Sequence, residues 1–191
     1  MVARPCRGAL LGKVRTEIDD QIAKIIQAQH VFFVATAPLA SGGNINLSPK
    51  GLDTFRILGP KTVAYLDVIG SGVETIAHLK ENGRIILMFC AFQGPPKIVR
   101  IHGQGRAVEP YSPEFPGLIS QFPHYDATRA IIMVQVTRVA DSCGFGVPLM
   151  EYRGEREQHF SWVQRKGPDG LRTYKAEKNR SSIDGLSGLA E

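Results

Sequence analysis

A short turn in the first half of the chain has the composition of an anion-binding site. Residues 70–75 read Gly-Ser-Gly-Val-Glu-Thr, and they follow a β-rich run and precede a helical pattern. A strand that stops at such a turn points free backbone N–H groups outward, with the positive end of the helix dipole behind them. Ser71 and Thr75 would add hydroxyl donors, and Gly72 would allow a ligand to approach the backbone closely. The alternative is simple helix capping with Ser71 as the N-cap, which the turn alone favours.

The same turn half-matches the dinucleotide-binding fingerprint G-x-G-x-x-G. Thr75, however, occupies the position where close packing of helix on sheet requires Gly or Ala. The next strand ends at Phe92 and Gln93, with no acidic residue to hold a ribose. The surrounding strands are joined by hairpin-length loops, whereas a Rossmann sheet needs a helix between nearly every pair. We therefore exclude a dinucleotide-binding domain.

Residues for other kinds of chemistry are sparse. The five histidines form no i, i+4 pair and the three cysteines no C-x-x-C pair, so we expect no metal site. No G-x-S-x-G elbow occurs, and Ser48 has no visible base partner. Asp53 and Asp67 could form a carboxylate pair, although Asp67 at a strand end could equally stabilise a turn. No catalytic residue is assigned.

The elements that must position these residues are mostly short strands. Residues 16–29 have the isoleucine spacing of an amphipathic helix, residues 73–82 form a short helix that Gly83 would cap, and residues 112–122 could form another. β-rich runs lie at residues 31–36, 46–51, 55–58, 62–68, 84–92, 97–109 and 130–139. Tight turns between them require antiparallel pairing. The expected fold is therefore mainly β (α+β), a barrel of about six antiparallel strands with an N-terminal helix, one short helix after the fourth strand and a helical C-terminal tail.

Composition and charge limit the remaining possibilities. We expect a flexible leader at residues 1–12, the barrel domain at 13–152, and a helical tail at 153–191 that packs on the barrel or on a dimer partner. No apolar stretch is long enough for a membrane helix or a secretory signal, so we expect a cytoplasmic protein without a membrane partner. The net charge of +5 comes from lysines and arginines spread along the chain, which argues against nucleic acid.

Two stretches carry a resemblance to a known family. Residues 46–51 (Asn-Leu-Ser-Pro-Lys-Gly), followed by residues 65–67 (Tyr-Leu-Asp) and the turn at residues 70–71, resemble the pyridoxamine 5′-phosphate oxidase-like FMN-binding family, whose fold is a split barrel. In that family a strand ends in a basic residue, which matches Lys50, and a strand-to-helix turn holds the FMN phosphate. The likeness runs from about residue 31 to residue 108. True oxidases carry Ser-Arg-Lys at the turn, where this chain has Val-Glu-Thr at residues 73–75, so the resemblance implies a flavin and leaves the substrate open.

The resemblance implies FMN as the cofactor and a small molecule as the substrate. Lys50 and Lys97 would supply positive charge, and the backbone around residues 46–48 and 66–67 would meet the ribityl chain and ring. The residues assigned to FMN are Asn46, Ser48, Lys50, Leu66, Asp67, Ser71, Gly72, Thr75 and Lys97. The expected function is an FMN-dependent oxidoreductase. The alternatives are a non-catalytic flavin or haem carrier on the same barrel, and an interaction domain without a cofactor.

We also expect a homodimer. A barrel of six strands fills its interior with side chains, so a flavin ring must lie on the outer wall. The near-continuous apolar runs at residues 84–92 and 130–139 indicate burial on both faces, more than a lone barrel provides. A two-fold partner would cover those walls, as it does in the family that the chain resembles.

Overall fold

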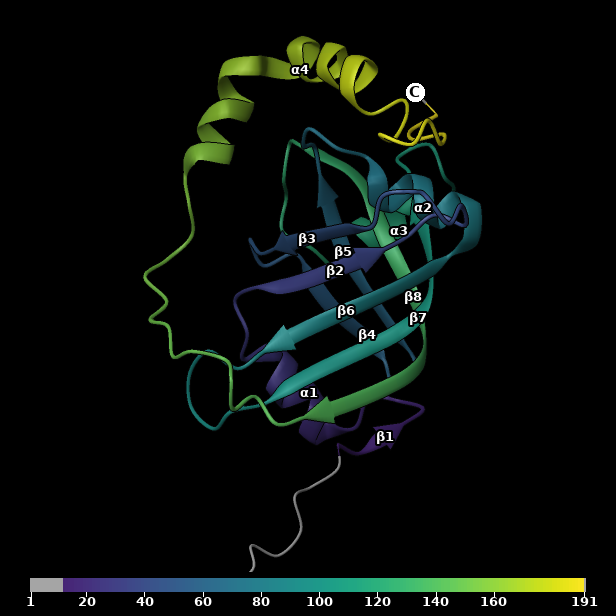
Figure 1. Ribbon diagram of the computed structural model, residues 1–191. Coiled ribbons are helices and arrows are strands. Elements are labelled where there is room, and N and C mark those ends of the chain that lie inside the picture. Colours follow the sequence, from purple (N-terminus) through teal and green to yellow (C-terminus); the bar gives the residue numbers. More distant parts are fainter. Residues whose placement is uncertain (1–11, 191) are drawn as a thin grey trace, which may run out of the picture.

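The computed structural model describes residues 12–190 of the 191-residue chain, and all but the last residue of the expected leader therefore lies outside the described residues. These described residues form one antiparallel sheet with four helices (Figure 1). In chain order the elements are β1 (Val14–Arg15), α1 (Asp20–Gln27), β2 (Phe32–Thr36), β3 (Asn46–Lys50), β4 (Phe55–Gly59), β5 (Thr62–Val68), α2 (Glu74–Asn82), β6 (Arg84–Cys90), β7 (Ile98–Val108), α3 (Phe115–Ile119), β8 (Thr128–Ser142) and α4 (Gln158–Lys178).

The strands are ordered β3-β2-β6-β7-β8-β5-β4, and β1 pairs with β8. Every pairing is antiparallel, as the short turns require. The expected mainly β, α+β split barrel is confirmed. The sheet has eight strands where about six were expected, and one of the additional strands is the two-residue β1, which is too short to leave a periodic pattern in the sequence.

The helix boundaries follow from capping chemistry. Asp19 caps α1, its Oδ1 accepting a hydrogen bond from the Ile22 N–H at 2.8 Å, and Ile22 and Ile26 face the core. Gly83 ends α2 in the left-handed conformation (φ 70°), as predicted, and its N–H donates to the Leu79 carbonyl. Both helices end within two residues of the expected positions.

The main core lies inside the curved sheet, where Phe32, Tyr65 and Phe89 are almost completely buried. A bulge between His102 and Gly103 bends β7 against β8. A Cβ atom at Gly103 would lie 2.4 Å from the Gln135 carbonyl oxygen, so only glycine fits there. Glycine inside a strand is typical of such a bulge.

Two helices cover other parts of the sheet. α3 lies on the outer face of β5 and β8, where Leu118 and Ile119 pack near Ile131. α4 arches over one end of the barrel, reached by residues 143–157, which run back along its side (Figure 1). The φ of 63° at Gly167, directly before Pro168, kinks α4. No helix among residues 12–190 is long and apolar enough to cross a membrane.

Candidate functional site

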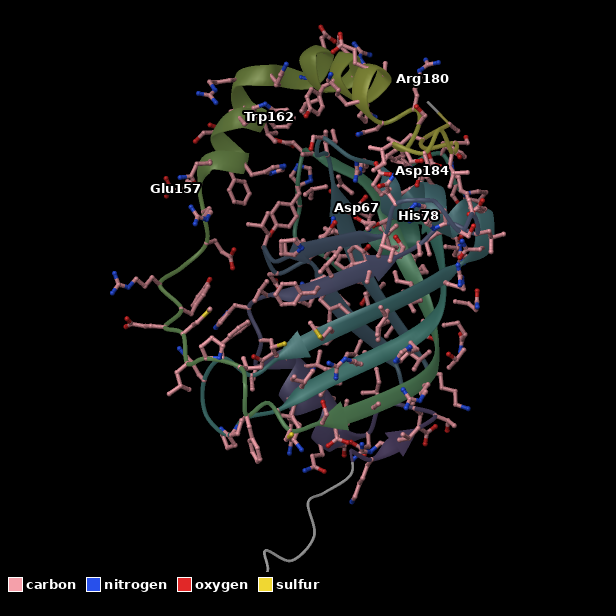
Figure 2. The ribbon with its side chains drawn as sticks, viewed as in Figure 1. Asp67, His78, Glu157, Trp162, Arg180 and Asp184 are labelled. Atoms are coloured by element: carbon pink, nitrogen blue, oxygen red, sulfur yellow. The ribbon has the colours of Figure 1, made fainter. Side chains whose placement is uncertain are left out.

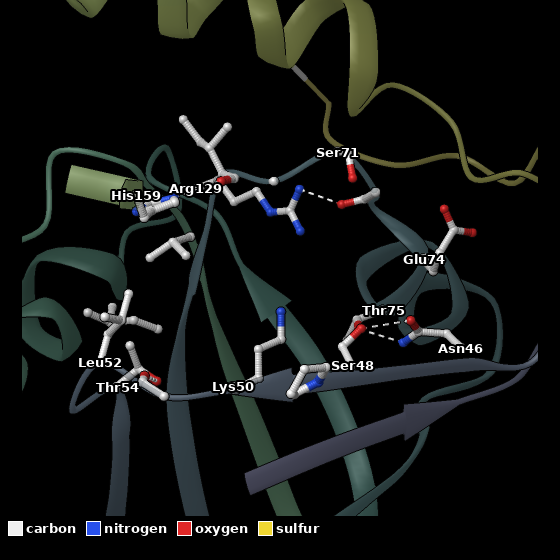
Figure 3. A pocket seen from close by; sticks show the side chains of 17 residues that line it. Asn46, Ser48, Lys50, Leu52, Thr54, Ser71, Glu74, Thr75, Arg129 and His159 are labelled. Atoms are coloured by element: carbon white, nitrogen blue, oxygen red, sulfur yellow. Dashed lines mark hydrogen bonds between the residues drawn. The ribbon is translucent and has the colours of Figure 1, made fainter. Parts of the chain in front are cut away.

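A cavity of about 450 Å³ opens beside the last residues of β3 and β5 and the turn before α2 (Figure 3). We call it the β3 cavity. Its other walls come from Arg129 at the start of β8 and from His159 in α4. The volume lies within the range of small-molecule and cofactor sites. Of the nine residues that the sequence assigned to FMN, seven line it: Asn46, Ser48, Lys50, Leu66, Ser71, Gly72 and Thr75.

Strand β3 supplies one wall through its alternating side chains. Asn46, Ser48 and Lys50 line the cavity, whereas Leu47 between them is exposed on the opposite face. The Ser48 hydroxyl donates to Asn46 Oδ1 at 3.0 Å, and Asn46 Nδ2 donates to the Thr75 hydroxyl at 3.0 Å (Figure 3). These bonds tie β3 to the first turn of α2 and fix the polar wall.

Two cations converge on one buried carboxylate at the base of the cavity. Lys50 Nζ donates to Asp67 Oδ1 at 3.0 Å, and Arg129 Nε donates to Asp67 Oδ2 at 2.7 Å. Asp67 is completely buried and lies behind the cavity wall. Burial alone would raise its pKa, but the charges of Lys50 and Arg129 and their hydrogen bonds outweigh burial and lower the pKa to about 2. Asp67 is therefore ionised, and the three side chains together carry one net positive charge.

Both cations keep donors available. Arg129 uses Nε for Asp67 and Nη1 for the Gly72 carbonyl at 2.7 Å, and its Nη2 has no hydrogen bond to any described residue. Lys50 uses one of its three N–H bonds on Asp67, and its side chain is 19% exposed, toward the cavity. The base of the cavity can thus donate several charge-assisted hydrogen bonds to an anion.

The turn at residues 70–73 carries unused backbone donors. The N-cap of α2 is Val73, which has no side chain able to cap, so capping by Ser71, the alternative use of this turn, is not what the structure shows. No described residue accepts a hydrogen bond from the N–H groups of Ser71, Gly72, Glu74 or Thr75. These donors sit at the positive end of the α2 dipole.

The C-terminal tail holds this turn from outside. Asn179 is completely buried, and its Nδ2 donates to the Gly70 carbonyl at 3.0 Å. His159 Nε2 donates to the Ile69 carbonyl at 3.1 Å, and the Ile183 N–H donates to the Glu74 carboxylate at 3.2 Å. Glu74, which also lines the β3 cavity, is thereby bonded to the tail.

A second set of contacts anchors the end of the tail. Asp184 accepts hydrogen bonds from the backbone N–H of Asn44 at 2.8 Å and from its side-chain amide at 2.6 Å. Figure 2 shows Asp184 close to α2, which carries the buried His78. Trp162 packs on Tyr174 and does not line the β3 cavity.

Lys97, which the sequence assigned to FMN, lies far from the β3 cavity. Its Nζ lies 3.0 Å from Asp141 near the end of β8, whereas Arg129 is at the start of that strand. Asp141 is twelve positions after Arg129, about 40 Å along an extended strand. The basic start of β7 therefore lies at the other end of the barrel.

Sequence reasoning missed Arg129, His159 and Asn179. The sequence did contain a signal for Arg129, because it directly precedes the apolar run at residues 130–134 and is therefore expected to be buried. A buried arginine needs a carboxylate partner, and β5 carries Asp67. His159 and Asn179 come from the tail, whose path over the barrel has no signature in the local sequence.

Comparison with known proteins gives concordant matches. The sequence model of the pyridoxamine 5′-phosphate oxidase family matches residues 18–143. The pyridoxamine 5′-phosphate oxidase family protein ustO of Aspergillus flavus is 37% identical over 189 residues, which cover 90% of this chain and 76% of that protein.

Two crystal structures share the fold at low sequence identity. A variant of the HupZ protein of Group A Streptococcus aligns with a TM-score of 0.52 and 19% identity over 65% of this chain and 98% of that one. A putative pyridoxamine 5′-phosphate oxidase from Lactobacillus delbrueckii aligns with a TM-score of 0.51 and 14% identity over 65% of this chain and 94% of that one. At these identities the likeness shows the fold alone.

Proposed function

Because the chain belongs to the pyridoxamine 5′-phosphate oxidase family, as its resemblance predicted, we propose that it is a flavoprotein that holds FMN by its phosphate in the β3 cavity. The observation that carries the proposal is the convergence of Lys50 and Arg129 with the donor-rich turn at residues 70–75. A phosphate monoester needs several donors and a positive field, and this set offers both.

The chemistry of the donor set fits the phosphate of FMN. Lys50 and Arg129 Nη2 would donate from the base of the cavity, and the N–H groups of residues 71–75 would donate from the turn. The hydroxyls of Ser71 and Thr75 border the same space. Asn46 and Ser48 on β3 would face the ribityl chain. The bound flavin would supply the redox chemistry, and the chain would supply anchoring, orientation and a substrate site.

We therefore propose an FMN-dependent oxidoreductase that acts on a small molecule. The test begins with the absorbance spectrum of the purified protein, in which flavin bands support the proposal. A Soret band would indicate a haem carrier, and an empty spectrum that FMN cannot restore would indicate an interaction domain. NADH and NADPH are then added to the FMN-loaded protein without oxygen. Bleaching of the flavin band supports an oxidoreductase, and a flavin that no donor reduces supports a carrier.

The role of the phosphate is tested by titrating the protein freed of flavin with FMN and with riboflavin, which lacks the phosphate. Two charge-assisted hydrogen bonds at the low end of their usual range contribute about 3 kcal/mol, so FMN should bind at least about 100-fold more tightly than riboflavin. Equal affinities would remove the phosphate from the β3 cavity.

We propose further that the protein is a homodimer. The apolar second face of β8, one basis for that expectation, is covered within the chain by α3, so it does not require a partner. The outward face of β3, β2 and β6 supports the proposal better, because Phe33, Ile86 and Met88 lie side by side there and Leu47 is 64% exposed. This face shares β3 with the proposed FMN site.

Light scattering should give two chains and two FMN molecules per particle. Met88→Glu should yield a monomer with weakened FMN binding, whereas Phe145→Glu, at an exposed residue in the loop after β8, should leave the dimer intact. A wild-type monomer that holds FMN tightly would refute the dimer.

A further inference from the structure

A second cavity, of about 560 Å³, adjoins the β3 cavity. Gly51, Leu52 and Thr54 line both, so the loop between β3 and β4 is their common wall. We call the second space the aromatic cavity. It lies between the end of α1, β4 and the segment that leads into α4.

Aromatic rings form both its base and its rim. Phe32, Phe55 and Phe89 form the base, with ring centroids 5.0 to 5.5 Å apart. Tyr152 and Phe160 form the rim, and they remain 43% and 39% exposed although both are large apolar residues. Such rings favour planar apolar ligands that can stack between them.

The rim already shows the stacking geometry that a planar ligand would use. His30 and Tyr152 lie parallel, at an interplanar angle of 7° and a centroid distance of 3.6 Å. Tyr125 and Phe160 lie 5.8 Å apart at 28°. Tyr152 lies in the segment that leads from the barrel to α4, and Phe160 lies in the first turn of α4. The C-terminal part of the chain therefore borders this cavity, as His159 borders the β3 cavity.

The charges of the aromatic cavity differ from those of the β3 cavity. Among the described residues that line it, Arg56 is the one lysine or arginine. Its guanidinium is committed to Asp53, at 2.9 and 3.1 Å, and to the carbonyl oxygens of Phe55 and Gln121. Glu155 adds a second carboxylate, which accepts a hydrogen bond from Tyr152. Asp53, Arg56 and Glu155 therefore carry one net negative charge.

The pKa of the Tyr125 phenol is shifted by burial and by the same three charged side chains. Its pKa is raised, first by burial and then by the carboxylates of Asp53 and Glu155, against the opposing charge of Arg56. An anionic ligand placed here would meet the same repulsion and would find no free cation among the described lining residues.

The wall between the two cavities has an unusual backbone. Leu52 and Asp53 adopt left-handed conformations, with φ of 62° and 51°, which a branched residue such as leucine rarely does. Groups of the aromatic cavity hold this wall, because the Tyr125 hydroxyl donates to the Leu52 carbonyl and Arg56 binds Asp53. Left-handed backbone at residues other than glycine persists where surrounding contacts fix it, and such residues are concentrated at ligand sites.

We infer that the aromatic cavity binds a planar aromatic small molecule that is neutral or positively charged, and that it is not a site for a phosphate ester. Its position across the 51–54 loop from the proposed FMN phosphate site makes it the candidate substrate site. That role rests on the proposed function, whereas binding itself does not.

The test uses three probes with one ring and different charges: tryptamine, 3-methylindole and indole-3-acetate. Calorimetry on the protein with and without FMN should show binding of tryptamine and 3-methylindole at least about 10-fold tighter than binding of indole-3-acetate. Glu155→Gln keeps an oxygen that can accept from Tyr152 and removes the charge, so it should reduce this discrimination. Tyr152→Ala and Phe160→Ala should weaken tryptamine binding about 10-fold, and Phe145→Ala, at an exposed ring outside the cavity, should not.

The outcomes separate this inference from the proposed function. Tryptamine binding to a protein that cannot bind FMN would support the aromatic cavity as a ligand site and overturn the proposed FMN site. FMN binding, with no binding of any probe at millimolar concentration, would support the proposed flavin site and overturn the inference about the aromatic cavity. Tightest binding of indole-3-acetate, or tryptamine binding that Tyr152→Ala leaves unchanged in a folded variant, would also overturn the inference.

Discussion

Replacement of Lys50 by alanine tests the charge arrangement at the base of the β3 cavity. In the wild type, Lys50 and Arg129 face the single carboxylate of Asp67, which leaves one net positive charge. Lys50→Ala removes that surplus and one donor to the proposed phosphate. A charge-assisted hydrogen bond contributes about 1.5–3 kcal/mol, so the Kd for FMN should rise about 10- to 150-fold. The Kd for riboflavin should change by less than about threefold, because riboflavin carries no phosphate.

Lys97→Ala is the matched control. Lys97 also pairs with an aspartate, Asp141, at 3.0 Å, but it lies at the opposite end of β8 from the cavity. Both variants remove one charge from the chain and one partly buried ion pair. Fluorescence titration of each variant with FMN and riboflavin, with a thermal melt to confirm folding, separates the local contribution of Lys50 from that of net charge.

Three results would refute the reasoning. An FMN affinity unchanged by Lys50→Ala would remove Lys50 from the site. Equal losses of FMN and riboflavin affinity in a folded Lys50→Ala protein would mean that Lys50 shapes the cavity without contacting the phosphate. A loss in Lys97→Ala as large as that in Lys50→Ala would mean that the net charge of the protein, and not a contact from Lys50, determines the affinity for FMN.

Three further predictions follow from the same geometry. Gly72→Val should weaken FMN binding more than 10-fold, because a branched side chain obstructs the N–H groups of the turn. The melting temperature should change little, because a Cβ atom at this position meets only the Glu74 side chain, at 3.5 Å. Equal losses of FMN affinity and melting temperature would favour a structural role for the turn. Asn179→Ala should weaken FMN binding several-fold through release of the Gly70 carbonyl, and calorimetric titration showing wild-type affinity would rule out this role of the tail. The pKa of Asp67 is lowered to about 2 in the folded protein, so its ionised form stabilises the fold above pH ~4 and this contribution, about 2 kcal/mol, is lost as the pH falls through about 2. In urea titrations the stability difference between wild type and Asp67→Asn should therefore shrink by that amount from pH 6 to pH 2, and a constant difference would contradict the lowered pKa.

Local patterns in the sequence were sufficient to predict the elements that carry the β3 cavity. Alternation and turn residues located β3 and β5, and Gly83 located the end of α2. The anion-binding turn could be predicted because its ingredients, small residues between a strand and a helix, are contiguous in the chain. Antiparallel pairing through short turns then restricted the topology to a barrel-like sheet.

Features that depend on distant segments could not be predicted in the same way. Arg129 and Lys97 both directly precede apolar strands, so a cation before an apolar run does not by itself show which of the two reaches Asp67. Their positions depend on the register of β7 and β8, which the bulge at Gly103 alters. The tail is harder still, since Asn179 reaches Gly70 across 109 residues of sequence.

The placement of Asp67 explains how a chain without the basic pair of the oxidase turn can still present a positive site. Two cations this close would repel each other and spread in solvent if nothing held them. A buried carboxylate with one oxygen for each cation fixes both positions, and its lowered pKa keeps it ionised at all physiological pH values. In the proposed site the positive charge comes from Lys50 on β3 and Arg129 on β8, and the turn would contribute backbone N–H groups and the hydroxyls of Ser71 and Thr75. Loss of basic residues from the turn is therefore compatible with an intact anion site.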